Sequence, residues 1–262
     1  MTVDDVPDPA WYGCDDSDRD DDPCTFEGVV TVTLPAGCVA GVGGVNSQWL
    51  GTVDPNCANS KHCGEAYPGY QTENYEAVYN DCAWEPRFDL WTRMYAGVCY
   101  QRFQDWDCNS PGIVNKDNYC TYATAFIYYD PCNPDDAGCY AVSDADCIAI
   151  HEGTHVQEWS DFWDTVPGWL EDRGYLDPLQ INCSDSNTIT CQAAAAFFES
   201  KIDRPLYRHL EEKYNEIGDC YGGEYRAREA AETCFHELGY DICRCAEDKG
   251  WAQQKPCSAC PQ

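Results

Sequence analysis

The segment His151-Glu152-Gly153-Thr154-His155 has the residue types and the spacing of a metal-dependent hydrolytic site. On a helix, residues four apart lie one turn apart on the same face, so both imidazoles can reach a single ion. Glu152 is rotated by one residue step, which places its carboxylate beside the ion rather than on it. A carboxylate in that position can take a proton from a metal-activated water molecule. The segment therefore predicts a zinc site with Glu152 as general base.

A helix over about residues 143–159 is predicted to carry this motif. Ser143 is the predicted N-cap, and the acidic residues at 144 and 146 suit the first turn. The preceding segment YCTYATAFIYYD, residues 119–130, is rich in aromatic and β-branched residues and is closed by Asp-Pro. This composition predicts a strand, so a strand, a loop and a helix are expected in that order.

With this motif and order of elements, the chain resembles the zincin metallopeptidases, in which the active-site helix follows an edge strand that binds extended substrate. The resemblance covers residues 119–240 and implies Zn²⁺ as cofactor, a peptide or protein substrate and a catalytic Glu152. It also implies an α+β, zincin-like fold, with a small mixed sheet, an active-site helix and a mostly helical, disulfide-rich C-terminal half. His151 and His155 match the family's first two metal ligands.

The third ligand is predicted from helical periodicity in GGEYRAREAAETCFHELGY. Ala227, Ala231, Cys234 and Leu238 form one small apolar face, and Glu224 begins that face. A charged residue on an inward face needs a buried partner, which a cation would supply. This resembles the gluzincin arrangement, with the third ligand on a later helix. The alternative is a first-turn glutamate that pairs with Arg228 at i+4.

Two other acids compete with Glu224 for the role of third ligand. Asp161 follows His155 by six residues, where metzincin-like peptidases place their third ligand after a turn at a glycine. Glu158 occupies the position of that glycine here. Glu199 shares a predicted helix face with Ile202. The oxyanion donor is left open among residues near Glu224, namely Tyr221, Tyr225, His236 and Tyr240.

Twenty cysteines spread along the chain indicate disulfides and an oxidising compartment. Only the terminal pairs, Cys243/Cys245 and Cys257/Cys260, are closely spaced, so thiol clusters at zinc-finger spacing are not found. The imidazoles are therefore the better metal ligands, and secretion or a periplasmic location is expected. The opening MTVDDVPDPAWYGC lacks a basic segment and an apolar segment, so we expect a leader that was removed.

The acidic composition excludes one class of partner. Sixteen basic residues against 46 acidic ones give a net charge of −30, which argues against binding nucleic acid. No apolar run is long enough for a membrane span. In the segment CDDSDRDDDPC, alternating aspartates suggest Ca²⁺ as a second cofactor, although the glycine and glutamate of an EF-hand are missing. These candidate calcium ligands are Asp16, Asp18, Asp20 and Asp22.

Composition divides the chain into three stretches, which we expect to form one compact unit. Residues 1–118 are an acidic β, turn and mixed region, in which FEGVVTVTLP predicts a strand and residues 66–118 predict one or two helices broken at Pro86. Residues 119–240 are the zincin-like region, with further helices over 191–217 and 223–238. Residues 241–262 are a Cys-rich tail.

A second class of function fits the same composition. High disulfide density and acidity also suit an extracellular structural or binding protein, such as a surface, filament or toxin component, with a vestigial or stabilising metal site. An open coordination position distinguishes a catalytic zinc site from a structural one, which four protein ligands close. The sequence predicts no particular oligomeric state.

Overall fold

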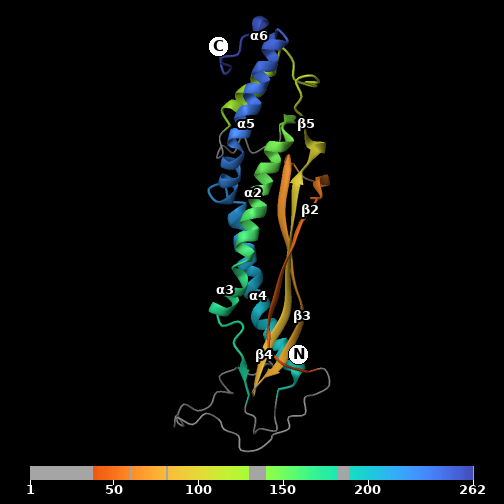
Figure 1. Ribbon diagram of the computed structural model, residues 1–262, viewed down its shortest axis with the longest axis vertical. Coiled ribbons are helices and arrows are strands. Elements are labelled where there is room, and N and C mark those ends of the chain that lie inside the picture. The colour runs from red at the N-terminus through yellow and green to blue at the C-terminus, as the bar shows by residue number, and fades with distance from the viewer. Residues whose placement is uncertain (1–37, 60, 81, 130–139, 182–188, 262) are drawn as a thin grey trace, which may run out of the picture. The chain divides into compact units, whose positions relative to one another are not determined.

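The computed structural model describes residues 38–59, 61–80, 82–129, 140–181 and 189–261. The four aspartates of the candidate calcium segment and the predicted strand FEGVVTVTLP lie outside these residues. The described chain is a mixture of helices and strands with a small curled sheet (Figure 1). The α+β class is therefore confirmed at this level.

Three long strands make up most of the larger sheet. Its hydrogen-bonded order is β1-β3-β4-β2, and β7 also pairs with β4. β1 runs parallel to β3, and β7 runs antiparallel to β4. A second, two-stranded sheet pairs β5 with β6 in parallel. The strand bounds are β1 Val39–Ala40, β2 Gly44–Val53, β3 Gly64–Asn80, β4 Ala83–Val98, β5 Gln104–Asp105, β6 Val142–Ser143 and β7 Leu179–Gln180.

The helices predicted within residues 66–118 are wrong, because β3 and β4 occupy most of that stretch. In β4, Phe88, Leu90, Thr92 and Met94 are buried and the residues between them are partly exposed. This is the period of two that defines a half-buried strand. Pro86 lies inside β4 and does not break a helix.

The segment predicted as a strand at residues 119–130 is instead the helix α1. Tyr119, Ala123 and Phe126 are its buried residues, and their spacing of four and three is helical. Aromatic and β-branched composition favours strands only weakly, and packing of this face overrides it. The helices are α1 Tyr119–Ile127, α2 Ala145–Trp163, α3 Val166–Asp172, α4 Cys191–Ile217, α5 Gly223–Asp248 and α6 Trp251–Gln254, with short 3₁₀ turns at Cys57–Asn59 and Tyr100–Arg102.

The other predicted helices are present with small corrections. α2 begins after Asp144, whose carboxylate accepts a hydrogen bond from the Asp146 backbone N–H at 2.8 Å. The predicted N-cap, Ser143, belongs to β6 instead. α4 has the predicted bounds, whereas α5 runs ten residues further than expected, to Asp248.

The described chain forms two compact units, each built from non-consecutive stretches. Unit 1 contains the described residues up to Gln48 with Tyr70–Trp91 and Thr165–Leu210, and unit 2 contains Trp49–Gly69, Thr92–Asp164 and Glu211 onward. In unit 1, the hydroxyls of Thr72 and Tyr75 donate to the Asp203 carboxylate at 2.9 and 2.7 Å, which joins α4 to β3. The HEGTH segment and Glu224 both lie in unit 2.

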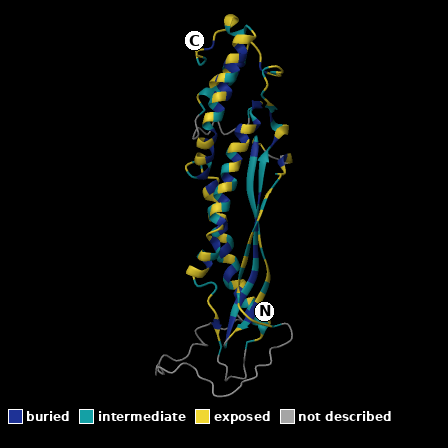
Figure 2. Ribbon diagram, viewed as in Figure 1, coloured by how far each residue is buried: buried dark blue, intermediate teal, exposed yellow. Residues whose placement is uncertain are grey.

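The core of unit 2 is formed where α5 packs against α1 and α2 (Figure 1). Buried and exposed residues alternate along α5 with a helical period (Figure 2). At Gly239, an added Cβ would lie 2.7 Å from Cγ1 and 2.8 Å from the backbone nitrogen of Ile127. The absence of a side chain there allows α1 and α5 to approach closely. Among the described residues, no helix has the length and apolar character needed to cross a membrane.

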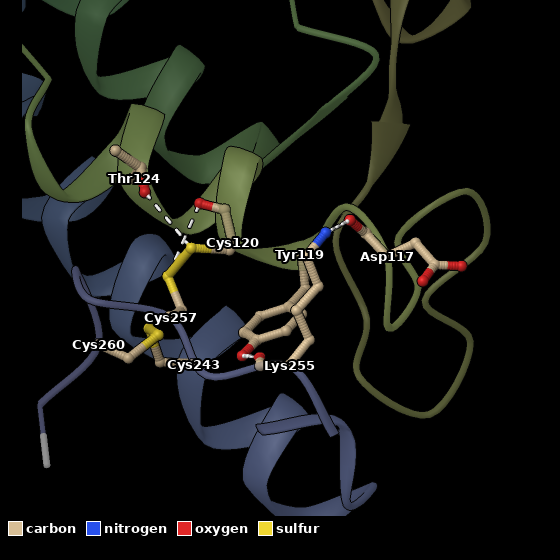
Figure 3. The surroundings of a disulfide bond; sticks show 8 residues. All are labelled: Asp117, Tyr119, Cys120, Thr124, Cys243, Lys255, Cys257 and Cys260. Atoms are coloured by element: carbon tan, nitrogen blue, oxygen red, sulfur yellow. Dashed lines mark hydrogen bonds between the residues drawn. A yellow bond between two sulfur atoms is a disulfide. The ribbon is translucent and has the colours of Figure 1, made fainter. Parts of the chain in front are cut away.

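Five disulfides between described residues strengthen unit 2, namely Cys57–Cys99, Cys108–Cys245, Cys120–Cys257, Cys147–Cys234 and Cys243–Cys260. Two of them attach the C-terminal segment, one to α1 and one to α5 (Figure 3). There the Tyr119 hydroxyl also donates to the Lys255 carbonyl at 2.5 Å. These cysteines thus cross-link the elements of unit 2.

Two glycine substitutions should have opposite effects on stability. Gly239→Ala should lower the free energy of unfolding by about 1–3 kcal/mol, because its methyl group would press on the backbone of α1. The methyl group added by Gly153→Ala in α2 would have no neighbour within 4 Å. This substitution should raise the free energy of unfolding by up to about 1 kcal/mol, because alanine has the higher helix propensity. Denaturant unfolding of both variants checks this, and a neutral Gly239→Ala would contradict the close helix contact.

Candidate metal centre

The helix α2 presents His151 and His155 side by side in unit 2. Their Nε2 atoms are 3.3 Å apart, and their rings are nearly perpendicular, at 85°. His155 is buried, with 5% of its surface exposed, while His151 is partly buried. The i,i+4 spacing thus directs both imidazoles to one point, as predicted.

The first turn of α5 brings Glu224 to the same point. Its Oε1 atom lies 3.5 Å from His151 Nε2, and its Oε2 atom lies 3.2 Å from His155 Nε2. The predicted face of α5 explains this placement, since Ala227 and Ala231 are fully buried below Glu224. Glu224 therefore begins the buried face of α5.

The spacing of these donor atoms fits a tetrahedral zinc site. Zinc bonds of about 2.0–2.1 Å to nitrogen and oxygen place neighbouring donor atoms about 3.3–3.4 Å apart. The observed separations of 3.2, 3.3 and 3.5 Å are close to this value. Two imidazoles and one carboxylate are also a common donor set for catalytic zinc. The residues present therefore fit the ion that the motif implies.

The pKa shifts of His151 and Glu224 are in the direction that metal binding requires. Burial lowers the pKa of His151 and favours the neutral imidazole that a metal requires. Burial alone would raise the pKa of Glu224, but hydrogen bonds with His151, His155 and Arg228 hold it well below its usual range. Glu224 is therefore ionised, and a neutral nitrogen and an anionic oxygen face the same point.

Arg228 fixes the orientation of the Glu224 carboxylate. Its Nε atom donates to Glu224 Oε1 at 2.7 Å, and only 9% of the residue is exposed. The i,i+4 pairing that was the alternative interpretation of Glu224 is thus present together with the histidine contacts. Arg228 is bonded to Oε1, while Oε2 faces His155. Second partners of this kind commonly orient metal ligands.

Glu152 lies close to both imidazoles. Donor atoms of His151, Glu152 and His155 all lie within 4.8 Å of one another. Glu152 is 7% exposed, and burial, together with the charges of Glu224 and Glu65, raises its pKa to about 8. Glu152 is therefore a buried acid that can hold or release a proton near neutral pH.

Gly64 at the start of β3 makes room for Glu152. A Cβ added to Gly64 would collide with the Glu152 carboxylate and would come within 2.7 Å of Ile148 Cγ2. The strand backbone therefore lies directly against the motif helix at this point. Sequence reasoning missed this contact, because nothing in HCGEAYPGY indicates which strand reaches α2.

A cavity of about 560 Å³ opens next to these residues, within unit 2. None of the predicted oxyanion donors, namely Tyr221, Tyr225, His236 and Tyr240, lines it, and Tyr221 is 85% exposed. Other aromatic residues that the sequence did not single out line it instead, together with Arg228. They are Tyr67, Tyr129, Tyr140, Tyr214 and Phe235. These residues come from separate stretches of the chain, so no local pattern could have grouped them.

The competing third ligands are placed differently. Asp161 is exposed on α2 and accepts a hydrogen bond from Gln157 at 2.6 Å. α2 continues through Glu158 without the turn that would bring Asp161 back toward His155. Glu199 is exposed on α4, whereas its neighbour Ile202 is buried. The aspartates proposed for calcium are outside the described residues.

Among the described residues, the group that contains both imidazoles includes no cysteine. Two further groups of metal-ligand types occur among these residues, Cys57–Glu65–Cys99 and Asp144–Cys147–Cys234. In each group the two cysteines are joined in a disulfide. The Cys147–Cys234 bond also links α2 to α5, one turn before His151. The cysteines thus hold together the helices that carry the imidazoles and Glu224.

The raised pKa of Glu152 predicts a pH-dependent stability in the presence of chelator. Below pH 4.5 the folded and unfolded states are both protonated, whereas between pH 4.5 and about 8 only the unfolded state releases the proton. The free energy of unfolding should therefore fall over this range, and Glu152→Gln should remove that loss. The free energy of unfolding of Glu152→Gln, relative to that of the parent, should rise by a few kcal/mol from pH 5 to pH 8. One pKa unit corresponds to about 1.4 kcal/mol.

Urea unfolding of parent and variant at several pH values measures this difference. Asp161→Asn, which removes an exposed acid from the same helix, serves as the control and should show no such trend. A difference between parent and Glu152→Gln that does not change with pH would contradict the assigned pKa shift.

Comparisons with protein-family models, with curated proteins and with solved structures found no match to this chain. The candidate centre is accordingly interpreted from its own residues, distances and charges.

Proposed function

We propose that this protein is a secreted, zinc-dependent metallopeptidase. The observation that carries the proposal is the contact of Glu224 with both imidazoles of the HEGTH helix. Two histidines that only packed against each other would not need a third donor atom from a distant part of the chain. Glu224 provides such a donor, and it lies on the helix face that periodicity predicted. The open cavity beside these residues supports a site that accepts a substrate.

The residues that would hold zinc are His151, His155 and Glu224. The ion, when bound, would polarise a peptide carbonyl and make a nearby water molecule more acidic. Glu152 would accept the proton from that water and deliver it to the leaving amine. Its burial matches this role, since the low polarity around it keeps its pKa near the pH at which it must exchange a proton.

The substrate would lie along the start of β3. Gly64, Glu65, Ala66 and Tyr67 line the cavity beside α2. Among the described residues, β1 pairs with β3 only at Val78 and Tyr79, so another extended chain could pair with this earlier stretch. β3 thus takes the role expected for residues 119–130, which form α1. The charge of −30 would favour approach of basic peptides.

The contact between Arg228 and Glu224 supports a second candidate function. Arg228 partly neutralises Glu224, so the polar cluster could also stabilise an extracellular structural or binding protein without catalysis. The five disulfides suit this alternative equally well. The two functions differ in whether the protein takes up zinc and hydrolyses peptides.

Two substitutions separate the roles of the acids. Glu152→Gln should retain one zinc per chain and reduce hydrolysis of a casein-like substrate by at least about 100-fold, because only the base is lost. Glu224→Gln should lose zinc as well as activity, because a ligand is replaced. Elemental analysis and hydrolysis with and without chelator measure both effects.

Asp161→Asn is the matched control and should keep both zinc and activity, because Asp161 is exposed and bonded to Gln157. A Glu152→Gln variant that cleaves as fast as the parent would contradict the assignment of Glu152 as the general base. A parent protein that takes up zinc and cleaves no peptide would favour the structural alternative.

A further inference from the structure

The first turn of α5, which carries Glu224, has no side-chain N-cap, although the Glu224 backbone N–H donates to the Asp219 carbonyl at 3.2 Å. The N-cap residue is Gly222, and it makes no side-chain capping hydrogen bond. Gly223 follows it, and glycine is among the least favourable residues in a helix. An uncapped turn that begins with two glycines is expected to fray unless another part of the protein holds it.

Glu158 on α2 reaches this turn from outside. It lies three residues after His155 and seven after His151, so all three project from the same face of α2. An added Cβ on Gly223 would lie 2.5 Å from Glu158 Oε2 and 2.6 Å from the Ile217 Cα. The glycine therefore lets the start of α5 lie between Glu158 and the end of α4. A negative charge is also favourable at a helix N-terminus.

An ion pair connects Glu158 to α5. The Nε atom of Arg226 donates to Glu158 Oε1, and its Nη2 atom lies 3.7 Å from Glu216 Oε1. The Glu158 side chain is only 15% exposed, and its Oε2 atom has no hydrogen-bond partner among the described residues. Glu158 is thus a largely buried carboxylate whose contacts are the first turn of α5 and Arg226.

The other contacts near Glu224 cannot replace this ion pair. The Arg228–Glu224 contact orients the carboxylate, but both residues belong to α5, so this contact does not fix α5 relative to α2. The Cys147–Cys234 disulfide joins the two helices ten residues beyond Glu224, about 15 Å along the helix axis. Among the described residues near the metal centre, the Glu158–Arg226 pair is thus a second charged link between α2 and the first turn of α5, beside the contacts of Glu224 with the imidazoles.

We propose that Glu158 is a positioning residue of the metal centre: through Arg226 it holds the first turn of α5 so that Glu224 faces His151 and His155. This rests on the proposed function, because it assigns to Glu158 a role in assembling the same zinc site. In this role Glu158 acts through Arg226 and is not itself a ligand of the ion. The expected consequence of its loss is weaker metal binding in a chain that remains folded.

Metal affinity of the full chain tests the proposal. Chelator-treated parent, Glu158→Gln, Arg226→Gln and the double variant are titrated with Zn²⁺ against a chromophoric chelator. Each single variant should raise the dissociation constant by about tenfold or more, as for other residues that orient metal ligands. The double variant should be no worse than either single variant, because both remove one shared interaction.

Two control variants and two further measurements separate positioning from general damage. Arg226→Lys keeps the charge and should bind within about threefold of the parent. Asp241→Asn, which removes an exposed ion pair with Arg244 on the same helix, should bind as the parent does. With Co²⁺ as the probe, the Gln variants should show a changed d–d absorption spectrum, whereas Asp241→Asn should not. Metal-free unfolding midpoints show whether each variant is folded.

The outcomes are distinguishable. Gln variants that are folded and bind zinc within about threefold of the parent would overturn the positioning role and leave the proposed function standing. Losses that simply add in the double variant would also overturn it, because the two residues would then act separately. A parent chain that takes up neither Zn²⁺ nor Co²⁺ would overturn the proposed function and this inference together.

Discussion

The contact between the Glu224 carboxylate and the imidazoles of α2 is the interaction on which the candidate site depends. It joins two helices whose relevant residues are about seventy positions apart in the sequence. An ionised carboxylate that is partly buried must be compensated, and here two imidazoles and Arg228 surround it. The packing of α5 on α2 is therefore both a structural contact and the step that assembles the site.

Small residues and covalent links make this contact geometrically feasible. Ala227 and Ala231 face inward on α5, and Gly239 permits the approach of α1 on another side of the same helix. The Cys147–Cys234 disulfide then fixes the helix pair at one level along its length. Disulfides constrain the unfolded chain as well, so they stabilise a scaffold whose centre contains several charged groups. The polar site is tolerated because the surrounding core is cross-linked.

The sequence indicated that His151, His155 and Glu224 would meet more reliably than it indicated the secondary structure around them. The His151–His155 spacing and the face that begins at Glu224 depend on helical periodicity over one or a few turns, which local sequence determines. The strand β3 and the helix α1 were assigned wrongly because aromatic composition is shared by strands and buried helices. The contact of Gly64 with Glu152 could not be predicted, because it depends on which strand packs against α2. Asp144 replaces Ser143 as N-cap, a shift of one residue that tertiary packing decides.

The charges within unit 2 explain why Glu152 and Glu224 behave differently although both are carboxylates in one small volume. Glu224 has Arg228 and the imidazoles as partners, and these keep it ionised. Burial and the negative charges of Glu224 and Glu65 disfavour the ionised form of Glu152, so its protonated form is favoured up to about pH 8. A divalent cation at the imidazoles would add positive charge close to Glu152 and would favour loss of that proton. Binding of the ion and deprotonation of Glu152 would then be thermodynamically linked. Glu224 would determine where the ion is held, and the charge of the ion would lower the pKa of Glu152.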